Sequence, residues 1–474
     1  MFKKFGGLAL GVSLLSLTAC THNAQGPETI LVVKPQTITV NGKTAEIYTI
    51  QQPDGAWGYS GVTGQEFNAL VENKTDVPIT LHWHGLIVPS DQDGVPYVSQ
   101  APIAPGASYH YHFKLKQSGT YWMHSHYGLQ MQQGLYAPLI IEDPQDPYKD
   151  AQNVVMLVSD FSFKSPAQIN YDLTHAPAMD MKGSMPGGHM GMMAKHAPDL
   201  NDVDYDAYLT NYHTLQQPET VAVSPGRSVR LRIINGASAS TFFINLGKLS
   251  GTVIAADGEA IKPVQGSVFG ISEGQRLDIL LRIPAGAKDA YPVLAEAEGT
   301  HQQTGLILIT PGAVPPAVPE TVPRAFGAIN PLQDTEFHAL QPLPEQVVSK
   351  QLTVTLQGDM SKYVWKINNQ VWPNITPMTV HKGDRVAMRI VNQTGMAHPM
   401  HLHGHVFEVT AVNGKPISDG PMRDTVLVPA NGSVTIEFDA DNPGNWMFHC
   451  HVIYHAEDGM MSIIQYEGTP NPPI

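Results

Sequence analysis

The sequence predicts an all-β fold made of three consecutive Greek-key β-sandwich domains. The chain has 474 residues, enough for several separate cores. It contains 42 Gly and 38 Pro, only 15% of its residues are charged, and short β-branched runs without helical periodicity lie between turn residues. One pattern, a turn glycine followed by a strand and an asparagine, also occurs three times, at 64–73, 226–235 and 383–392. Composition and repeat together indicate three copies of one sandwich.

The formal net charge of −14 argues against nucleic acid or an anionic membrane surface as the partner of the folded chain. An acidic chain suits a cationic substrate, although the same charge also serves solubility alone. The two cysteines, Cys20 and Cys450, each fall in a motif of another kind. No disulfide is therefore expected.

Residues 1–19 predict an export signal that is removed from the mature protein. Lys3 and Lys4 precede an apolar run too short to span a bilayer as a structural helix. The segment ends Leu-Thr-Ala-Cys20, which resembles the lipobox of bacterial lipoproteins; an ordinary signal peptide with a chance cysteine is the alternative. We expect a lipid anchor on Cys20 and a place at the cell envelope. Thr21 favours the periplasmic face of an outer membrane, if the cell has one.

The first domain is expected at 29–143 and contains two His-x-His pairs, His82/His84 and His124/His126. Residues two apart on a strand lie on the same side, so each pair presents two imidazoles in one direction. A single pair of this kind is more often structural than metal-binding. The third domain repeats both pairs at matched positions, which favours metal ligation.

The second domain is expected at 153–310 and lacks these histidines. Its repeat has Ile244 and Leu246 where the other copies have histidines, so we interpret it as a spacer. An aperiodic stretch at 178–196, threaded with Gly and Pro, predicts a mobile loop of soft ligands suited to Cu(I). A flexible low-complexity insertion is the alternative. The candidate ligands of this loop are Met179, Met181, Met185, His189, Met190, Met192 and Met193.

A Pro-rich segment at 311–349 predicts an extended, structureless linker before the third domain at 350–474. That domain contains the peptide His449-Cys450-His451, followed by His455 and Met460. Cysteine, two histidines and a weak axial methionine form the ligand set of a blue copper site. Zinc is the competing metal, but zinc sites favour four tetrahedral ligands without methionine.

Alternation along a strand places Cys450 on one side of the sheet and both neighbouring histidines on the other. One short peptide can then ligate metal on both sides. The third domain also contains a second group of histidines: His398, His401, His403 and His405. If domains one and three dock face to face, eight imidazoles from four His-x-His pairs converge, enough for three coppers with open positions for O2.

The chain resembles the three-domain multicopper oxidases, and among them the bacterial copper-resistance members. The resemblance is strongest in the stretches Leu-His-Trp-His-Gly-Leu-Ile-Val-Pro at 81–89 and His-Ser-His-Tyr-Gly-Leu-Gln at 124–130. It implies cupredoxin-like domains and four copper ions, one type 1, one type 2 and two type 3. It also implies an oxidoreductase that couples one-electron oxidation of a substrate to the four-electron reduction of O2 to water.

The resemblance implies a role for each candidate ligand. The type 1 copper would take His398, Cys450 and His455 with Met460 axial, and the type 2 copper His82 and His401. The two type 3 coppers would take His84, His124 and His451, and His126, His403 and His449. His405 matches no ligand position and is interpreted as structural.

Two acids are candidates for proton delivery. Asp93 matches an acid that related oxidases keep near the type 2 copper; a turn residue before Gly94 is the alternative. Glu457 is the second candidate, although related enzymes carry their acid directly after the distal type 1 histidine, where this chain has Ala456.

The substrate is less clearly encoded. The Met-rich stretch favours Cu(I), which gives the hypothesis of a cuprous oxidase acting in copper tolerance. A laccase-like oxidase of phenols or pigments is the first alternative. A ferroxidase would need acids beside the type 1 site, and the sequence alone places none there. A non-enzymatic copper-sequestering protein is the last alternative, and the intact ligand set argues against it. A monomer is expected.

Overall fold

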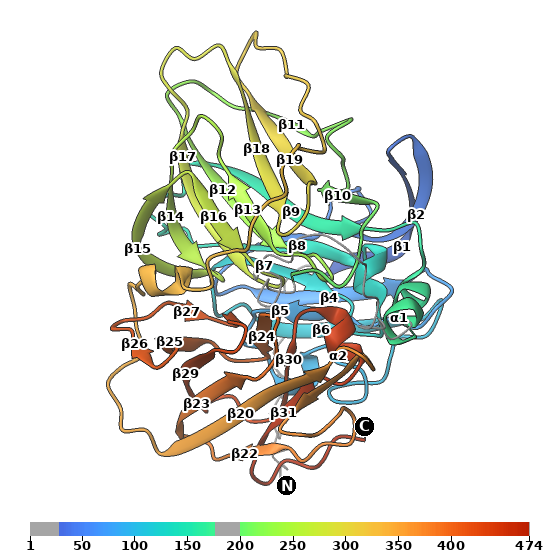
Figure 1. The fold of residues 1–474 in the computed structure, drawn as a ribbon, viewed down its shortest axis with the longest axis vertical. Coiled ribbons are helices and arrows are strands. Elements are labelled where there is room, and N and C mark those ends of the chain that lie inside the picture. Colours follow the sequence, from blue (N-terminus) through green and yellow to red (C-terminus); the bar gives the residue numbers. More distant parts are fainter. Residues whose placement is uncertain (1–27, 176–199, 474) are drawn as a thin grey trace, which may run out of the picture.

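The computed structural model describes residues 28–175 and 200–473, and strands dominate this part of the chain. The strands form six sheets that pair into three two-sheet units, which confirms the predicted all-β class. Figure 1 shows the first unit, in blue and cyan, between the second above it and the third below it. The predicted export signal, Cys20 and the Met-rich stretch at 178–196 lie outside the described residues.

The first unit has the sheet orders β2-β1-β4-β6 and β3-β8-β7-β5. Its strands are β1 (Thr29–Val40), β2 (Lys43–Gln51), β3 (Tyr59–Val62), β4 (Glu66–Asn73), β5 (His82–His84), β6 (Ser108–Lys114), β7 (Gly119–His124) and β8 (Tyr136–Glu142). Two short 3₁₀ helices interrupt its loops, η1 (Ser90–Gln92) and η2 (Gln130–Gln133).

The second unit has the sheet orders β10-β9-β12-β17-β14-β15 and β11-β19-β18-β13-β16. Its elements are β9 (Gln152–Phe161), α1 (Pro166–Thr174), β10 (Ala207–Thr210), β11 (Thr220–Ala222), β12 (Ser228–Asn235), β13 (Phe242–Asn245), β14 (Gly251–Ala256), β15 (Glu259–Gly266), β16 (Val268–Ile271), β17 (Arg276–Arg282), β18 (Ala290–Ala297) and β19 (Gln303–Ile309). Helix α1 begins at an N-cap serine, Ser165, whose side chain accepts from the Gln168 amide.

The third unit has the sheet orders β21-β20-β23-β29-β25-β26, with β27 paired to β25, and β22-β31-β30-β24-β28. Its elements are β20 (Lys350–Asp359), β21 (Val364–Ile367), β22 (Met378–Val380), β23 (Arg385–Asn392), β24 (His398–Leu402), β25 (Phe407–Val412), β26 (Lys415–Pro416), β27 (Met422–Arg423), β28 (Thr425–Val428), β29 (Ser433–Asp439), β30 (Asn445–Cys450), α2 (Ile453–Glu457) and β31 (Met461–Tyr466). Neither helix α1 nor α2, the α-helices of the described residues, is long and apolar enough to cross a membrane.

The three sequence repeats form equivalent strands, β4, β12 and β23. Each pairs in parallel with the first strand of its unit, β1, β9 or β20. Each repeat ends at a buried asparagine, Asn73, Asn235 or Asn392, whose side-chain amide donates to main-chain carbonyls of neighbouring loops at 2.6–3.3 Å. Because unpaired buried polar groups are costly, this asparagine stabilises the same loop geometry three times.

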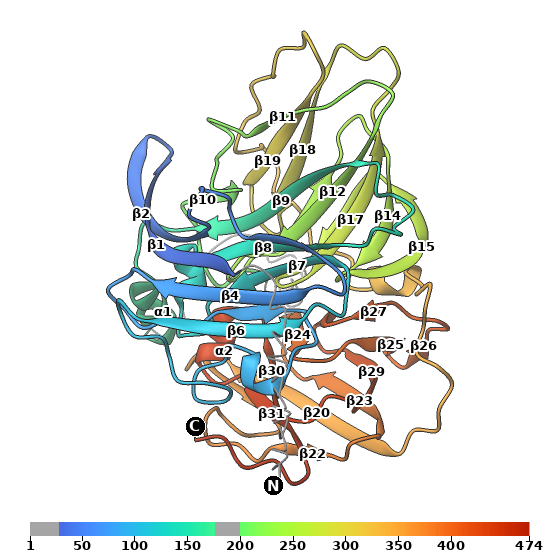
Figure 2. The ribbon, with the colours of Figure 1, turned by 180° about the vertical axis from the view of Figure 1, so that it is seen from behind.

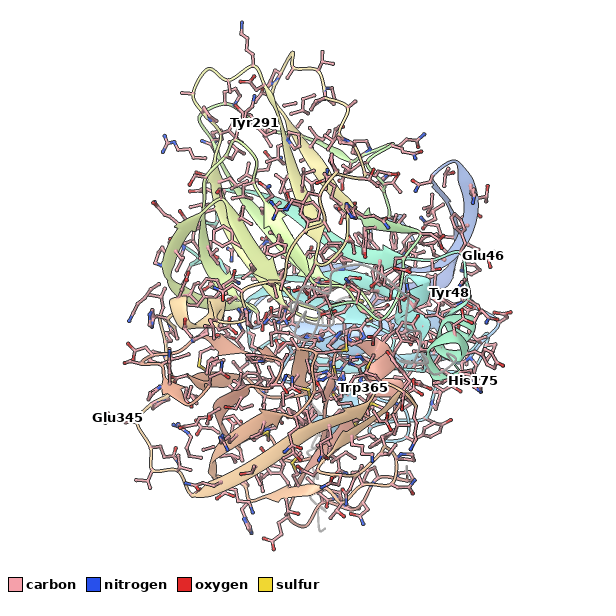
Figure 3. All side chains as sticks on the ribbon, in the orientation of Figure 1. Glu46, Tyr48, His175, Tyr291, Glu345 and Trp365 are labelled. Carbon is pink, nitrogen blue, oxygen red and sulfur yellow. The ribbon has the colours of Figure 1, made fainter. Side chains whose placement is uncertain are left out.

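The apolar core is continuous across the units. One cluster of buried side chains contains Phe67 of the first unit, Leu231 of the second and Trp365 of the third. Each such side chain contributes about 1.5–3 kcal/mol when it is fully buried. Figure 3 shows Trp365 well inside the molecule and Glu345 at its margin.

The segment at 311–349 differs in part from the structureless linker that its composition predicts. It forms none of the named strands, and Val314 and Val347 are 83% and 85% exposed. It does, however, contain the 3₁₀ helix η3 (Gln333–Glu336), and the ring of Phe337 after it is buried. Asp334 on this helix pairs with the buried Arg423 at 2.5 Å, which attaches the segment to the third unit.

Candidate metal centre

Four short strands position the predicted metal ligands where the first and third units meet. In the first unit His82 on β5 lies opposite His124 on β7, and in the third unit His401 on β24 lies opposite His449 on β30. Figure 1 shows β5, β24 and β30 close together at the boundary between the two units. Strand β13 of the second unit instead carries the buried Ile244. The repeat therefore supplies matched histidine pairs from two units.

Eight buried or largely buried imidazoles converge between the two units. Their nitrogens form three groups, in each of which the candidate ligand atoms lie within 4.8 Å of one another. Measured nitrogen–nitrogen separations are 3.3 Å for His126–His449, 3.0 Å for His403–His449 and 3.2 Å for His84–His451. Two nitrogens bound at 2.0–2.1 Å to one metal lie about 3.3 Å apart at a tetrahedral angle. The three groups are His82, His84 and His401; His84, His124 and His451; and His126, His403 and His449.

The hydrogen bonds of these rings leave one nitrogen free to face the group. The Nδ1 atoms of His82, His124 and His401 donate to main-chain carbonyls at 2.8–2.9 Å. The Nε2 atoms of the same rings are buried and have no hydrogen-bond partner among the described residues. Histidines that ligate a metal characteristically have their other nitrogen fixed in this way. The arrangement of these three rings therefore fits metal ions held by Nε2. His84 differs, because its Nε2 contacts Asp424 and its Nδ1 faces His451 Nε2.

Burial also favours the neutral form in seven of these imidazoles, His84, His124, His126, His401, His403, His449 and His451. It lowers the pKa of His449 to about 4 and holds the pKa values of His84, His126 and His403 well below the usual range. A neutral imidazole has a lone pair available for a metal at neutral pH.

A separate group forms around Cys450, as alternation along β30 predicts. Its Sγ lies 3.7 Å from the Nδ1 atoms of both His398 and His455, and those two nitrogens are 3.2 Å apart. Met460 is fully buried, and its carbonyl accepts from the Cys450 amide at 3.1 Å. A thiolate, two imidazoles and a neighbouring thioether are the donor set of a blue copper site.

Hydrogen bonds to the Nε2 atoms orient the two histidines of this group, because these atoms point away from Cys450. His398 Nε2 is 2.7 Å from Thr394 Oγ1, and His455 Nε2 donates to Asp202 Oδ2 at 2.7 Å. The ring of Trp365 packs on His455 with centroids 3.9 Å apart. The sequence contains a signal for Thr394, which follows the repeat asparagine by two residues as Thr75 follows Asn73. Asp202 comes from the second unit and has no such signal.

Asp93 is both a turn residue and a neighbour of the cluster. Its Oδ2 accepts from His403 Nδ1 at 2.9 Å, and its Oδ1 lies 3.1 Å from His82 Nδ1. Gly94 has φ +75°, and a Cβ there would lie 1.7 Å from the carbonyl oxygen of Leu81. The glycine therefore permits the turn that brings this carboxylate between two histidines. The two interpretations of Asp93 are compatible.

Asp424 is a second buried acid at the cluster, and motif analysis missed it. Its carboxylate accepts from His84 Nε2 at 3.1 Å and forms a two-pronged ion pair with the fully buried Arg276 at 2.7 and 2.5 Å. Its main-chain carbonyl accepts from His401 Nδ1. A second-unit cation thus fixes a third-unit carboxylate that orients a first-unit histidine. The second unit is therefore more than a spacer.

The remaining predicted residues take different places. His405 is hydrogen-bonded at both nitrogens, to the His403 carbonyl and to Tyr466 Oη, so no nitrogen is left for a metal. Glu457 ends helix α2 and lines a cavity together with His126 and His449. It is not among the groups that could hold a metal ion in the described chain.

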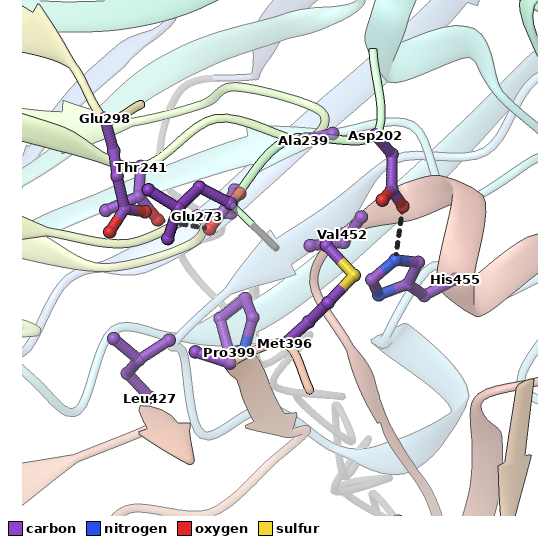
Figure 4. A pocket seen from close by; sticks show the side chains of 12 residues that line it. Asp202, Ala239, Thr241, Glu273, Glu298, Met396, Pro399, Leu427, Val452 and His455 are labelled. Atoms are coloured by element: carbon purple, nitrogen blue, oxygen red, sulfur yellow. Dashed lines mark hydrogen bonds and ion pairs between the residues drawn. The ribbon is translucent and has the colours of Figure 1, made fainter. Parts of the chain in front are cut away.

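A cavity next to His455 combines acidic and apolar walls. Figure 4 shows Asp202 and His455 on one side, Glu273 and Glu298 on the other, and the Met396 thioether between them. Burial raises the pKa of Glu273 to about 8 and that of Glu298 to about 7. Although burial opposes it, the charge and hydrogen bond of His455 lower the pKa of Asp202. At neutral pH Asp202 is therefore the fixed anion of this cavity.

Comparison with known proteins agrees with this geometry. Three family models, each described as multicopper oxidase, match residues 32–146, 153–310 and 346–468. The chain is 32% identical to the multicopper oxidase MmcO of Mycobacterium tuberculosis over 94% of this chain and 88% of that protein. It is 26% identical to copper resistance protein A of Escherichia coli over 96% of this chain and 95% of the other.

A laccase from Botrytis aclada is a similar solved structure. It matches with a TM-score of 0.75 and 26% identity, covering 92% of this chain and 87% of the laccase.

Proposed function

The chain belongs to the multicopper oxidase family, and from that premise we propose that it is a cuprous oxidase of the cell envelope. As a family member it is an oxidoreductase with copper cofactors that uses O2 and a reducing substrate. We further propose that the reducing substrate is Cu(I) and that the protein acts in copper tolerance. The observation that carries it is the cavity beside His455, where a thioether and a carboxylate lie together.

Four copper ions are assigned to the groups described above. The type 1 copper would be held by His398, Cys450 and His455, with Met460 as the fourth donor, and the type 2 copper by His82 and His401. The type 3 coppers belong to the group of His84, His124 and His451 and to the group of His126, His403 and His449. Support comes from the nitrogen separations, the unpaired Nε2 atoms and the burial of these rings.

Bound copper would supply one-electron transfer at the Cys450 site and reduction of O2 at the histidine cluster. The chain provides the connection, because Cys450, the last residue of β30, is covalently adjacent to both His449 and His451. Asp202 holds the Nε2 proton of His455, and Trp365 shields the same ring from water. Asp93 Oδ2 holds the Nδ1 proton of His403. Its Oδ1 lies 3.1 Å from His82 Nδ1 and has no hydrogen bond among the described residues.

The cavity chemistry supports Cu(I) over the alternatives. Met396 is 7% exposed and provides a soft sulfur ligand, which Cu(I) prefers. Asp202 Oδ1 is buried without a hydrogen-bond partner in the described structure and offers an anionic oxygen in the wall of the same cavity. The Met-rich stretch at 178–196 is a further source of thioethers in the sequence, outside the described residues.

A ferroxidase is the second candidate, because acids do lie beside the type 1 group. Asp202, Glu273 and Glu298 all line the cavity, although no sequence pattern predicts their positions. Fe(II) prefers hard anionic oxygens, whereas the raised pKa values of Glu273 and Glu298 leave a substantial share of these carboxyls neutral at pH 7. Because neutral carboxyls are poor ligands for Fe(II), we rank Fe(II) below Cu(I) as the substrate.

The test is steady-state O2 consumption by the copper-loaded protein with Cu(I), Fe(II) and a phenol measured side by side. We expect the highest kcat/KM with Cu(I). Met396→Leu should lower kcat/KM for Cu(I) at least ten-fold and leave phenol oxidation nearly unchanged. The Cys450→Ser protein serves as the control for oxidation without the type 1 site. Equal losses for Cu(I) and phenol in the Met396 variant would contradict the assigned substrate.

Location and assembly complete the proposal. The lipobox-like segment supports a lipid anchor on Cys20 in a bacterial lipoprotein of the cell envelope, and the chain acts as a monomer. Metabolic labelling with a radioactive fatty acid should mark the wild-type protein, whereas Cys20→Ala protein should stay unlabelled. Labelling of both proteins would contradict the anchor.

A further inference from the structure

Another His-x-His pair, His110 and His112, lies outside the metal centre. Both residues are on β6, the edge strand of the first-unit sheet β2-β1-β4-β6, visible in Figure 2. Residues two apart on a strand lie on the same side. The two side chains are 41% and 39% exposed, so external ions can reach them.

The pair is accompanied by two carboxylates. His110 Nε2 lies 3.6 Å from Glu28 Oε1, and His112 Nε2 lies 3.7 Å from Glu66 Oε2. Glu66 is on the neighbouring strand β4, and Glu28 directly precedes β1. Both separations exceed a hydrogen-bond length, so neither imidazole is held tightly by its carboxylate. Two nitrogens and two carboxylate groups therefore share one face of the sheet.

The four side chains do not have the spacing of a bound ion in this conformation. The His110 and His112 rings are nearly parallel, at 12°, with centroids 6.4 Å apart. Nitrogens bound to one ion at 2.0–2.1 Å lie about 3 Å apart, and this set is not among the groups of the described residues whose ligand atoms lie within 4.8 Å of one another. Both histidines are partly exposed, so binding of one ion requires their side chains to rotate toward each other.

We propose that His110, His112, Glu28 and Glu66 form a surface site for one divalent transition-metal ion, with Cu(II) the preferred ion. Imidazole suits Cu, Zn and Ni, and among divalent ions Cu(II) binds such N/O sites most tightly. Two carboxylates balance the charge of the ion. In the cuprous oxidase such a site holds the Cu(II) product. That role rests on the proposed function, whereas binding itself does not.

The experiment is a titration of the fully copper-loaded protein with Cu(II). Calorimetry measures the binding, and EPR reports the ligands of the added ion. We expect one additional Cu(II) per chain with an EPR signal typical of tetragonal nitrogen ligation. His110→Asn and His112→Asn should each weaken this binding about 10- to 100-fold, the range typical for damage to a metal site. Oxidation of a phenol should be unchanged in both variants.

His381→Asn is the matched control. His381 also lies on the surface between two carboxylates, 2.8 Å from Glu467 and 3.4 Å from Asp384, but it is a single imidazole. Its replacement should leave the additional ion in place. If His381→Asn weakens binding as much as His110→Asn does, or if neither β6 variant weakens it, the site does not exist.

A change at Lys114 should strengthen binding of the ion rather than weaken it. It lies directly across from Glu66 in the β4–β6 pairing, so its charge competes with the ion for that carboxylate. Lys114→Gln should tighten binding about two- to five-fold, as expected from removal of one exposed charge interaction. The Cys450→Ser protein should bind the additional ion as the wild type does. Loss of oxidase activity and loss of this site are therefore distinguishable.

Discussion

At the residue scale, the side chains that hydrogen-bond to the candidate ligands are as important for the metal centre as the ligands themselves. Asp424 contacts His84 and Arg276 with its carboxylate and His401 with its carbonyl, and these residues come from three different units. Buried ion pairs of this kind contribute little to net stability against an apolar replacement, but breaking one partner is costly. Asp424 is therefore a positioning residue whose loss is predicted to affect both stability and metal retention.

Asp424→Asn should lower the free energy of unfolding by up to about 3–5 kcal/mol, because the buried Arg276 loses its two-pronged partner and keeps only the 3.7 Å ion pair with Asp257. Denaturant unfolding measures this loss, and metal analysis should show reduced copper content. The control is Asp419→Asn, which breaks an exposed ion pair with Lys262 between the same two units and should cost less than about 1 kcal/mol. Similar losses in the two variants would mean that Asp424 is not specially placed.

Met460→Leu tests the axial ligand of the type 1 site. Removing the weak thioether should raise the reduction potential of the blue copper, because the axial ligand tunes it. Redox titration of the blue absorption measures the shift. An unchanged potential would exclude Met460 as the axial ligand and direct attention to Met461.

At the scale of strands and loops, the repeat asparagine links folding to metal binding. Asn392 accepts from the Thr394 amide and hydroxyl, and Thr394 in turn contacts His398 Nε2. Asn235 makes the equivalent loop contacts in the second unit, where no metal ligand follows. The same local structure therefore serves a metal site in one unit and only the fold in another.

The matched pair Asn392→Ala and Asn235→Ala separates these roles. Each should cost about 1–3 kcal/mol of stability, because buried main-chain groups lose their partners. Only Asn392→Ala should also weaken the blue absorption of the copper-loaded protein. Thermal unfolding and absorption spectra measure the two effects. A weaker blue band in the Asn235 variant would contradict the assignment.

Sequence patterns could predict what is local and repeated. Strand alternation and the repeat register predicted that Cys450 lies apart from His449 and His451, and the structure has these three residues in three different groups of candidate ligands. Asp202 and Asp424 escaped prediction because their contacts join residues 253 and 340 positions apart. Such contacts depend on how the units dock, and docking depends on surfaces that show no periodic pattern. The acids of the cavity beside His455 could not be placed for the same reason.

At the scale of the whole molecule, the concentration of buried histidines makes stability depend on pH. Burial lowers the pKa of nine of them below the usual value of 6.5: His84, His124, His126, His398, His401, His403, His405, His449 and His451. An unfolded chain binds protons at these rings near pH 6.5, whereas the folded chain resists them, to about pH 4 at His449. Stability therefore falls as pH falls through this window.

The metal-free protein should lose about 1.4 kcal/mol per pH unit for each such histidine below pH 6.5. Several histidines together make the fall steep, and copper should delay it, because bound metal occupies the lone pairs. Denaturant unfolding at pH 7.5, 6.5 and 5.5, with and without copper, measures both effects. A metal-free stability that stays flat between pH 7.5 and 5.5 would contradict neutral, buried imidazoles.

The central claim is that the first and third units together hold three coppers and that the third unit holds a fourth at Cys450. Anomalous diffraction at the copper absorption edge from crystals of the copper-loaded protein tests it most directly. We expect one peak among His398, Cys450 and His455, and three among the eight histidines between the units. No peak at Cys450, or fewer than three peaks among those histidines in fully loaded protein, would contradict it.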